Sequence, residues 1–223
     1  MRSTTSLVLA AMLAAPAVTA PLMATPALAQ QAATVDPKAA SGFIQSLSDK
    51  AFAVLRDASL SQAQRDQKFR TLLQEGFALD VIGNSVLGTA RRTATPEQLR
   101  AFHAAFPDYV IRIYATRLTE YGNSQLKVTG TTPAPRGDIY VRTLVTGPKV
   151  QQPVRADWRL RQTPDRGLKI IDLSLEGVSM AVTQRDEFTV KIQSKGLDAL
   201  IAEIRTGGTA SAAARPASPG KSK

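Results

Sequence analysis

The spacing of apolar residues changes once along the chain, and this change constrains the fold more than any other feature of the sequence. Up to about residue 121, apolar residues recur every three to four positions, as on one face of an amphipathic helix. From about residue 124 they alternate with polar residues, which is the pattern of β-strands with one buried face. Helices followed by strands predict an α+β fold.

The first half of the chain predicts four helices. Their ranges are 37–58, a helix that begins after Ser61, a short apolar helix over 77–88 that stops at Gly88, and a long helix over 96–121. The long helix begins at Thr95, which caps the first turn, and Gln98 completes a capping box. Pro107 lies inside this helix and should kink it or split it in two.

The second half predicts a sheet and two closing helices. Four β-rich runs, separated by turns rich in Gly and Pro, cover residues 124–132, 138–147, 153–162 and 167–175. In the third run, Val154, Ala156, Trp158 and Leu160 face one way, and Arg155, Asp157, Arg159 and Arg161 face the other. Helices follow over 180–194, with Ser179 as N-cap, and over 197–205. We expect the helices to pack on one face of a curved, four-stranded, mainly antiparallel sheet.

The two ends of the chain differ from this folded part. Residues 1–29 have the pattern of a secretory signal peptide, with a basic start, an apolar stretch and a small-x-small cleavage site at 27–29. Residues 207–223 are small, polar and basic, a composition that favours disorder. The formal charge of +10 includes four positive charges in these ends, so residues 36–206 carry +6. We therefore expect one soluble domain, exported to the periplasm of a Gram-negative bacterium.

The composition excludes several kinds of site. The chain has no cysteine and one histidine, which excludes disulfides, zinc fingers, iron–sulfur clusters and cysteine nucleophiles. The sequence also lacks the motifs of phosphate loops, metalloproteases and serine hydrolases, so we expect no metal and no cofactor. His103 has no catalytic partner near it in sequence and is expected at the surface or the boundary of the core.

The charged and apolar residues bear on three possible functions: acid–base chemistry, nucleic-acid binding and binding of an apolar ligand. Asp172 and Glu176, at the end of the last run, are the one carboxylate pair suited to acid–base chemistry, although such pairs more often bind backbone donors or arginine. Nucleic-acid binding is disfavoured because the aromatic residues lie on predicted buried helix faces. The surplus of apolar residues on the long helix and the sheet is compatible with ordinary core and with a lined cavity, because both have the same period.

Two stretches of the sequence form a pattern in combination. The first reads Val86-Leu87-Gly88, followed by Thr95-Pro96-Glu97-Gln98 and then by Phe102 and Phe106. The second reads Asp172-Leu173-Ser174-Leu175-Glu176-Gly177-Val178-Ser179-Met180, followed by Phe188 and by Lys195-Gly196-Leu197-Asp198-Ala199-Leu200. In this order, and over about residues 36–206, they resemble the MlaC family of periplasmic phospholipid-binding proteins, also called toluene-tolerance proteins.

The resemblance implies a carrier and not an enzyme. Such proteins take phospholipid between an outer-membrane lipoprotein complex and an inner-membrane ABC transporter, and so maintain the lipid asymmetry of the outer membrane. The acyl chains would lie in an apolar cavity between sheet and helices, with the headgroup at its mouth. We expect a monomer that binds its protein partners transiently.

Under this resemblance, the lining residues come from both halves of the chain. From the short apolar helix and the long helix we expect Val81, Ile82, Val86, Leu87, Phe102, Phe106, Val110, Ile113 and Tyr114. From the sheet we expect Ile139, Val141, Val145 and Trp158. Each is equally compatible with ordinary core. Arg91 and Arg92 are candidates for the mouth or the partner surface, where the family commonly has an aromatic residue, and they are also compatible with a solvated helix end.

Three alternatives to a phospholipid carrier remain open from the sequence. The cargo could be a hopanoid or another polycyclic lipid. The protein could be a small α+β enzyme that uses Asp172 as acid or base. It could also be an adaptor that binds partners through the basic face of the third β-run, in which case binding would vanish with salt.

Overall fold

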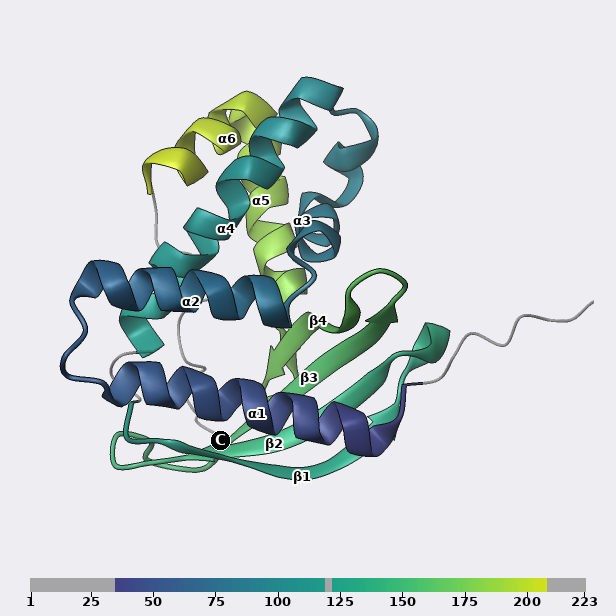
Figure 1. The fold of residues 1–223 in the computed structure, drawn as a ribbon. Coiled ribbons are helices and arrows are strands. Elements are labelled where there is room, and N and C mark those ends of the chain that lie inside the picture. The colour runs from purple at the N-terminus through teal and green to yellow at the C-terminus, as the bar shows by residue number, and fades with distance from the viewer. Residues whose placement is uncertain (1–34, 119–121, 208–223) are drawn as a thin grey trace, which may run out of the picture. The chain divides into compact units, whose positions relative to one another are not determined.

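The computed structural model describes residues 35–118 and 122–207 (Figure 1). The predicted signal peptide and all but the first residue of the predicted tail lie outside the described residues. The elements, in order, are α1 (Pro37–Arg56), α2 (Gln62–Gly76), α3 (Leu79–Leu87), the 3-10 helix η1 (Gly88–Arg92), α4 (Pro96–Leu118), β1 (Gln125–Pro133), the short 3-10 turn η3 (Pro135–Gly137), β2 (Ile139–Thr146), β3 (Val154–Thr163), β4 (Gly167–Leu175), β5 (Val178–Ser179), α5 (Met180–Lys195) and α6 (Leu197–Thr206). The predicted α+β class is confirmed.

The helices begin and end where local chemistry predicts. The Ser61 side chain caps α2 in a complete capping box with Gln64. At the start of α4, the Gln98 amide donates to the Thr95 hydroxyl at 3.2 Å, and the Thr95 amide donates to the Gln98 side chain at 3.0 Å. Gly88 ends α3 with a φ of 55°, a conformation that favours glycine.

Pro107 does not split the long helix. Helix α4 continues across it from Pro96 to Leu118, while residues 119–121 of the predicted helix lie outside the described chain. Proline removes one backbone donor, but Phe106 before it and Tyr109 after it are buried in the same apolar cluster. Side-chain packing on both sides of the proline therefore holds the helix together.

The sheet has one strand more than predicted. Its order is β1-β2-β3-β4-β5, and each strand is antiparallel to its neighbour. The fifth strand, Val178–Ser179, folds back on β4 because Glu176 and Gly177 form a tight turn with φ of 49° and 82°. A strand of two residues shows no alternation of apolar and polar side chains. The sequence pattern therefore predicted four strands, and this number was wrong. Ser179 is also the N-cap of α5, as predicted.

The predicted inward face of the sheet is confirmed, because Ile139, Val141 and Leu160 are buried in one cluster with residues of α1. Ile139 lies opposite Leu160, and Val141 lies opposite Trp158. A bulge between Arg159 and Leu160 interrupts the pairing of β3 with β4. Helix α1 lies along the inner face and packs against β1 and β2, as Figure 1 shows.

The other helices do not form a single layer on the sheet. Helices α3, α4, α5 and α6 share an apolar cluster of their own, in which α4 packs against α3 and α6. A smaller cluster around Phe69 and Ile111 joins α2 and α4 to α1. The wide apolar face of α4 thus contacts other helices, whereas the sequence pattern predicted contact with the sheet. No helix in residues 35–118 or 122–207 is long and apolar enough to cross a membrane.

Candidate functional site

The residues predicted to line a cavity are divided between two packed clusters. The first, the helical cluster, contains Val86, Leu87, Phe102 and Phe106, with Ile82, Val110 and Ile113 packed against it. The second, the sheet cluster, contains Ile139 and Val141, with Trp158 packed against it. The remaining three, Val81, Tyr114 and Val145, are half-buried.

Aromatic rings dominate the helical cluster. The Phe102 and Phe106 rings stack with 5.3 Å between centroids, and Phe188 of α5 meets Phe102 edge-on at 6.0 Å. Tyr109 is 4% exposed, and its hydroxyl donates to Gln184 at 3.1 Å. These side chains pack against one another between α3, α4, α5 and α6, and the Tyr109–Gln184 hydrogen bond lies among them.

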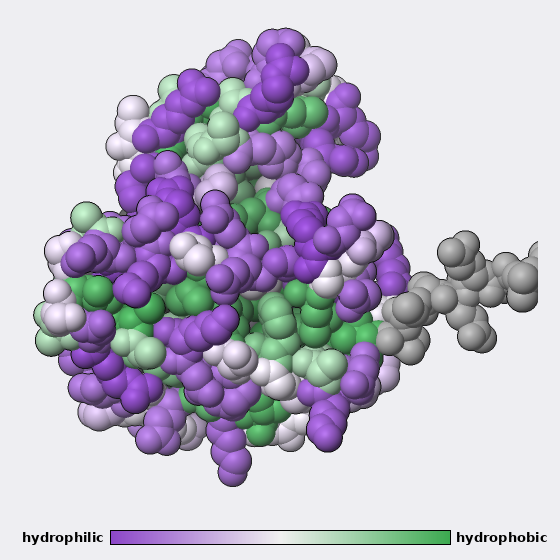
Figure 2. Space-filling model, viewed as in Figure 1, coloured by the Kyte–Doolittle hydropathy of each residue, from purple (hydrophilic) through white to green (hydrophobic). Residues whose placement is uncertain are grey.

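The sheet cluster is closed by α1. Ala40 and Ile44 of α1 are buried against the inner face of the sheet, together with Val141. The Trp158 indole nitrogen donates to the Thr143 hydroxyl at 3.0 Å, so its polar atom is satisfied within the sheet. Figure 2 shows apolar surface at the level of α1 and α2 among predominantly polar side chains.

Strand β4 contacts the junction of α2 and α3 at the edge of the sheet cluster, and we call this region the seam. Residues 74–80 on one side and 166–170 on the other define it. The Ala78 amide donates to the Ile170 carbonyl at 3.0 Å, and Phe77 forms a parallel bridge with Ile170. Lys169 is 8% exposed, and its ammonium donates to the last carbonyls of α2, at Gln74 (3.2 Å) and Glu75.

An ion pair lies at the exposed end of the seam. Arg166, in the β3–β4 turn, donates through both terminal nitrogens to the two carboxylate oxygens of Asp80, each at 3.0 Å. The hydrogen bond from Arg166 lowers the pKa of Asp80, and the same bond raises the pKa of Arg166. Asp80, Arg166 and Lys169 belong to no sequence motif, and the acidic residue in the first turn of α3 is the one local signal for them.

Arg91 and Arg92 lie in η1 and are exposed. Neither makes an ion pair with any residue that the structure describes. Helix η1 packs beside α5, and a side chain at Gly88 would come within 3.2 Å of Arg185. A role for Arg91 and Arg92 at a mouth or a partner surface stays a prediction.

Asp172 is fully used as an acceptor of structural hydrogen bonds. Its carboxylate accepts from the Leu173 amide at 2.8 Å, the Ser179 hydroxyl at 2.6 Å and the Ala181 amide at 3.2 Å. Glu176 instead accepts from the backbone amide of Arg155. The two carboxylates therefore bind different donors, and Asp172 joins the end of β4 to the start of α5.

We expect Asp172→Asn to cost about 1 kcal/mol of folding free energy, because it weakens a helix cap without opening a cavity. Urea unfolding followed by circular dichroism measures this loss. Lipid loading of the folded variant should match that of the wild type. A folded variant that gained or lost lipid without a change in stability would contradict this structural role for Asp172.

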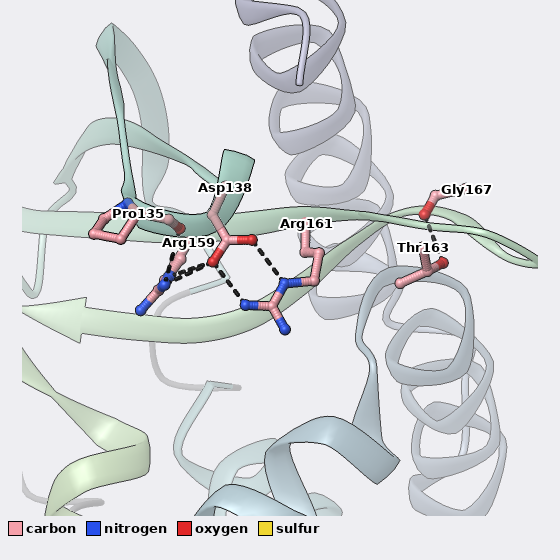
Figure 3. A network of polar contacts seen from close by, with 6 residues as sticks. All are labelled: Pro135, Asp138, Arg159, Arg161, Thr163 and Gly167. Atoms are coloured by element: carbon pink, nitrogen blue, oxygen red, sulfur yellow. Dashed lines mark hydrogen bonds and ion pairs between the residues drawn. The ribbon is translucent and has the colours of Figure 1, made fainter. Parts of the chain in front are cut away.

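The outer face of the sheet is polar. Asp138 is buried there and accepts hydrogen bonds from Arg159 and Arg161, as Figure 3 shows. Burial raises the pKa of Asp138, but the hydrogen bonds from Arg161 and Arg159 outweigh it, so its pKa is lowered. This face also carries a depression of about 240 Å³, lined by Tyr140, Arg142, Asp157, Ser174 and Gly177. Its polar lining and its position opposite the sheet cluster make it unsuited to acyl chains.

His103 and the carboxylates leave no metal site in the described ranges. The His103 ring nitrogen Nε2 lies 3.2 Å from the Asn84 side-chain oxygen, and the ring meets Phe102 edge-on. His103 is half-buried, so its predicted place at the boundary of the core is confirmed. Residues 35–118 and 122–207 contain no group of three or more His, Asp or Glu side chains that could hold a metal ion.

The fold and its two clusters define an α+β protein in which α1 covers one face of an antiparallel sheet and α3, α4, α5 and α6 form a cluster of their own. A family model described as "MlaC protein" matches residues 45–206. The chain belongs to the MlaC family.

The known proteins that are similar to this chain include one sequence relative and one solved structure. The intermembrane phospholipid transport system binding protein MlaC of Haemophilus influenzae is 24% identical over 171 residues, which cover 73% of this chain and 78% of that protein. A solved structure of the phospholipid-binding protein from Ralstonia solanacearum, in complex with a phospholipid, superposes with a TM-score of 0.64 at 22% identity. The superposition covers 75% of this chain and 96% of the Ralstonia chain, so the two chains share a fold.

Proposed function

We propose that this protein is a periplasmic phospholipid carrier. The observation that carries the proposal is the family match over residues 45–206. The Haemophilus relative is named as a phospholipid transport binding protein, and the Ralstonia structure holds a phospholipid. Asp172, the one residue that the sequence nominated for catalysis, is occupied by three structural hydrogen bonds, which favours a carrier over an enzyme.

The acyl chains would lie between the helical cluster and the sheet cluster. Each methylene group that leaves water contributes roughly 0.8 kcal/mol, so a fatty acyl chain needs an apolar environment. Both clusters supply apolar surroundings: the helical cluster through Phe102 and Val86, and the sheet cluster through Val141 and Trp158. In the described arrangement these side chains pack against protein atoms, so lipid entry would require some of these contacts to open.

The finer proposal concerns the partners of the carrier. The carrier would move phospholipid between an outer-membrane lipoprotein complex and an inner-membrane ABC transporter, and so maintain outer-membrane lipid asymmetry. The signal pattern of residues 1–29 and the net charge of +6 on residues 36–206 support export and contact with anionic surfaces. The carrier would act as a monomer.

Native mass spectrometry of the gently purified chain tests this function. We expect a mass increment equal to one or more phospholipids, and we expect the delipidated protein to take up phospholipid from vesicles. Extraction of the bound material separates phospholipid from a polycyclic lipid. A clean unliganded mass, together with no uptake from vesicles, would contradict the carrier function.

A further inference from the structure

The Asp80–Arg166 ion pair joins the β3–β4 turn to the first turn of α3. It lies at the exposed end of the seam, and its side chains are 53% and 47% exposed. Figure 1 shows the β3–β4 hairpin reaching up toward α3 at this point. Val81 and Ile82, two predicted lining residues, follow Asp80 directly in α3, and Ile82 packs against the helical cluster.

On the other side of the pair, the chain leads into the sheet cluster. Leu168, two residues after Arg166, packs against that cluster, and Ile170 is buried within it. Arg166 is thus a half-exposed cation, and within two positions of its ion pair Ile82 packs against the helical cluster and Leu168 against the sheet cluster. A phospholipid has the same distribution of chemistry, because its charged phosphate stays in water while its chains seek apolar surroundings.

The contact with Asp80 is one that phosphate reproduces. A guanidinium presents parallel N–H donors that bind two oxygens of a carboxylate or of a phosphate in the same way. Arg166 uses both terminal nitrogens on Asp80, each at 3.0 Å. The neighbouring cation, Lys169, is buried and already donates to α2 carbonyls, so it does not compete for the anion.

The geometry points to Arg166 as the residue that binds the phosphate diester of the lipid, an inference that rests on the proposed function. In the unliganded protein, the Asp80 carboxylate occupies the position of this phosphate on the Arg166 guanidinium. Lipid entry then exchanges one anion for another at the same guanidinium. The exchange also releases the β3–β4 turn from α3, and this release frees the exposed end of the seam.

Two variants of the same ion pair distinguish this role from a merely structural one. Both Asp80→Asn and Arg166→Gln break the pair, so a structural role predicts the same change for both. Anion exchange predicts opposite changes. Arg166→Gln should lower the affinity for phosphatidylglycerol from vesicles roughly tenfold or more, because a charge-assisted contact is lost. Asp80→Asn should bind this lipid at least as well as the wild type, because its competing carboxylate is gone.

Matched variants control for exposure and charge. Lys50→Gln breaks the Lys50–Glu75 pair between α1 and α2, whose side chains are 58% and 52% exposed, and it should leave lipid affinity unchanged. Arg166→Lys keeps the positive charge but loses the planar guanidinium that binds two oxygens at once. Its affinity for phosphatidylglycerol should therefore lie between those of Arg166→Gln and the wild type. Thermal unfolding of each variant checks that it is folded.

Binding experiments with three ligands show whether Arg166 recognises a lipid phosphate or free phosphate. With diacylglycerol, which has the chains but no phosphate, the wild type and Arg166→Gln should bind alike. The Arg166 side-chain Nε–H resonance should move on addition of phosphatidylglycerol vesicles and not with inorganic phosphate at the same phosphate concentration. An equal shift with inorganic phosphate, or a persistent defect of Arg166→Gln with diacylglycerol, would overturn the assignment.

The remaining outcomes are equally decisive. If Asp80→Asn and Arg166→Gln lose affinity to the same extent, or if Arg166→Gln binds like the wild type, the assignment of Arg166 fails while the carrier function stands. If the wild type takes up no lipid at all, the proposed function fails and the assignment fails with it.

Discussion

Replacing Phe102 by alanine should lower the free energy of unfolding by about 3–5 kcal/mol, because it removes a large buried ring and leaves a cavity. Phe102 is fully buried and contacts the rings of Phe106 and Phe188. Urea unfolding, followed by far-UV circular dichroism, measures the loss as a lower midpoint with an unchanged slope.

Val190→Ala is the control for Phe102→Ala. Val190 lies in α5 and is 66% exposed, so its loss should change stability by less than about 0.5 kcal/mol. If an acyl chain contacts Phe102 as proposed, it would fill part of the cavity, and the destabilisation should be smaller in the lipid-loaded protein. Equal losses with and without lipid would argue that Phe102 is core and not lining.

Asp138→Asn should cost roughly 1–3 kcal/mol at pH 7. The Asp138 side chain is buried, and it is the partner of both Arg159 and Arg161. Removing one partner of a buried pair is costly, but these arginines are 25% and 30% exposed, so water compensates part of the loss. Thermal and urea unfolding measure the effect.

The cost of Asp138→Asn should depend on pH. The pKa of Asp138 is lowered in the folded protein, because hydrogen bonds from the arginines outweigh its burial. Its stabilisation is therefore complete above the unfolded-state pKa, about 4, and is lost as the pH falls through the lower folded-state pKa. The wild type should lose its advantage over Asp138→Asn below about pH 4. A constant difference between the two proteins down to pH 2 would contradict the assignment.

Local chemistry made the elements of this fold predictable. The caps at Ser61, Thr95 and Ser179 use side chains within three residues of the amides that they bind. Alternation along residues 153–162 predicted the buried face of β3, because the side-chain period of a strand is two. The two-residue strand β5 was missed because a period cannot be seen in so short a segment.

The candidate site was less accessible to sequence reasoning. The apolar pattern of α4 predicted that Phe102 and Phe106 are buried, which the structure confirms. It did not predict that they contact α3 and α5 instead of the sheet. The seam was missed entirely, because Asp80 and Arg166 are 86 positions apart and neither belongs to a motif.

The sequence by itself determined the α+β class, the ends of the helices and the side of each strand that is buried. These properties depend on residues within one or two turns of each other, where steric and hydrogen-bonding preferences act directly. Only the tertiary structure decided that the apolar residues form two clusters, that Asp138 binds Arg159 and Arg161, and that Arg166 meets Asp80 at the seam. The physical reason is that periodicity specifies that a face avoids water, whereas the surface it packs against depends on how all the elements fill space together.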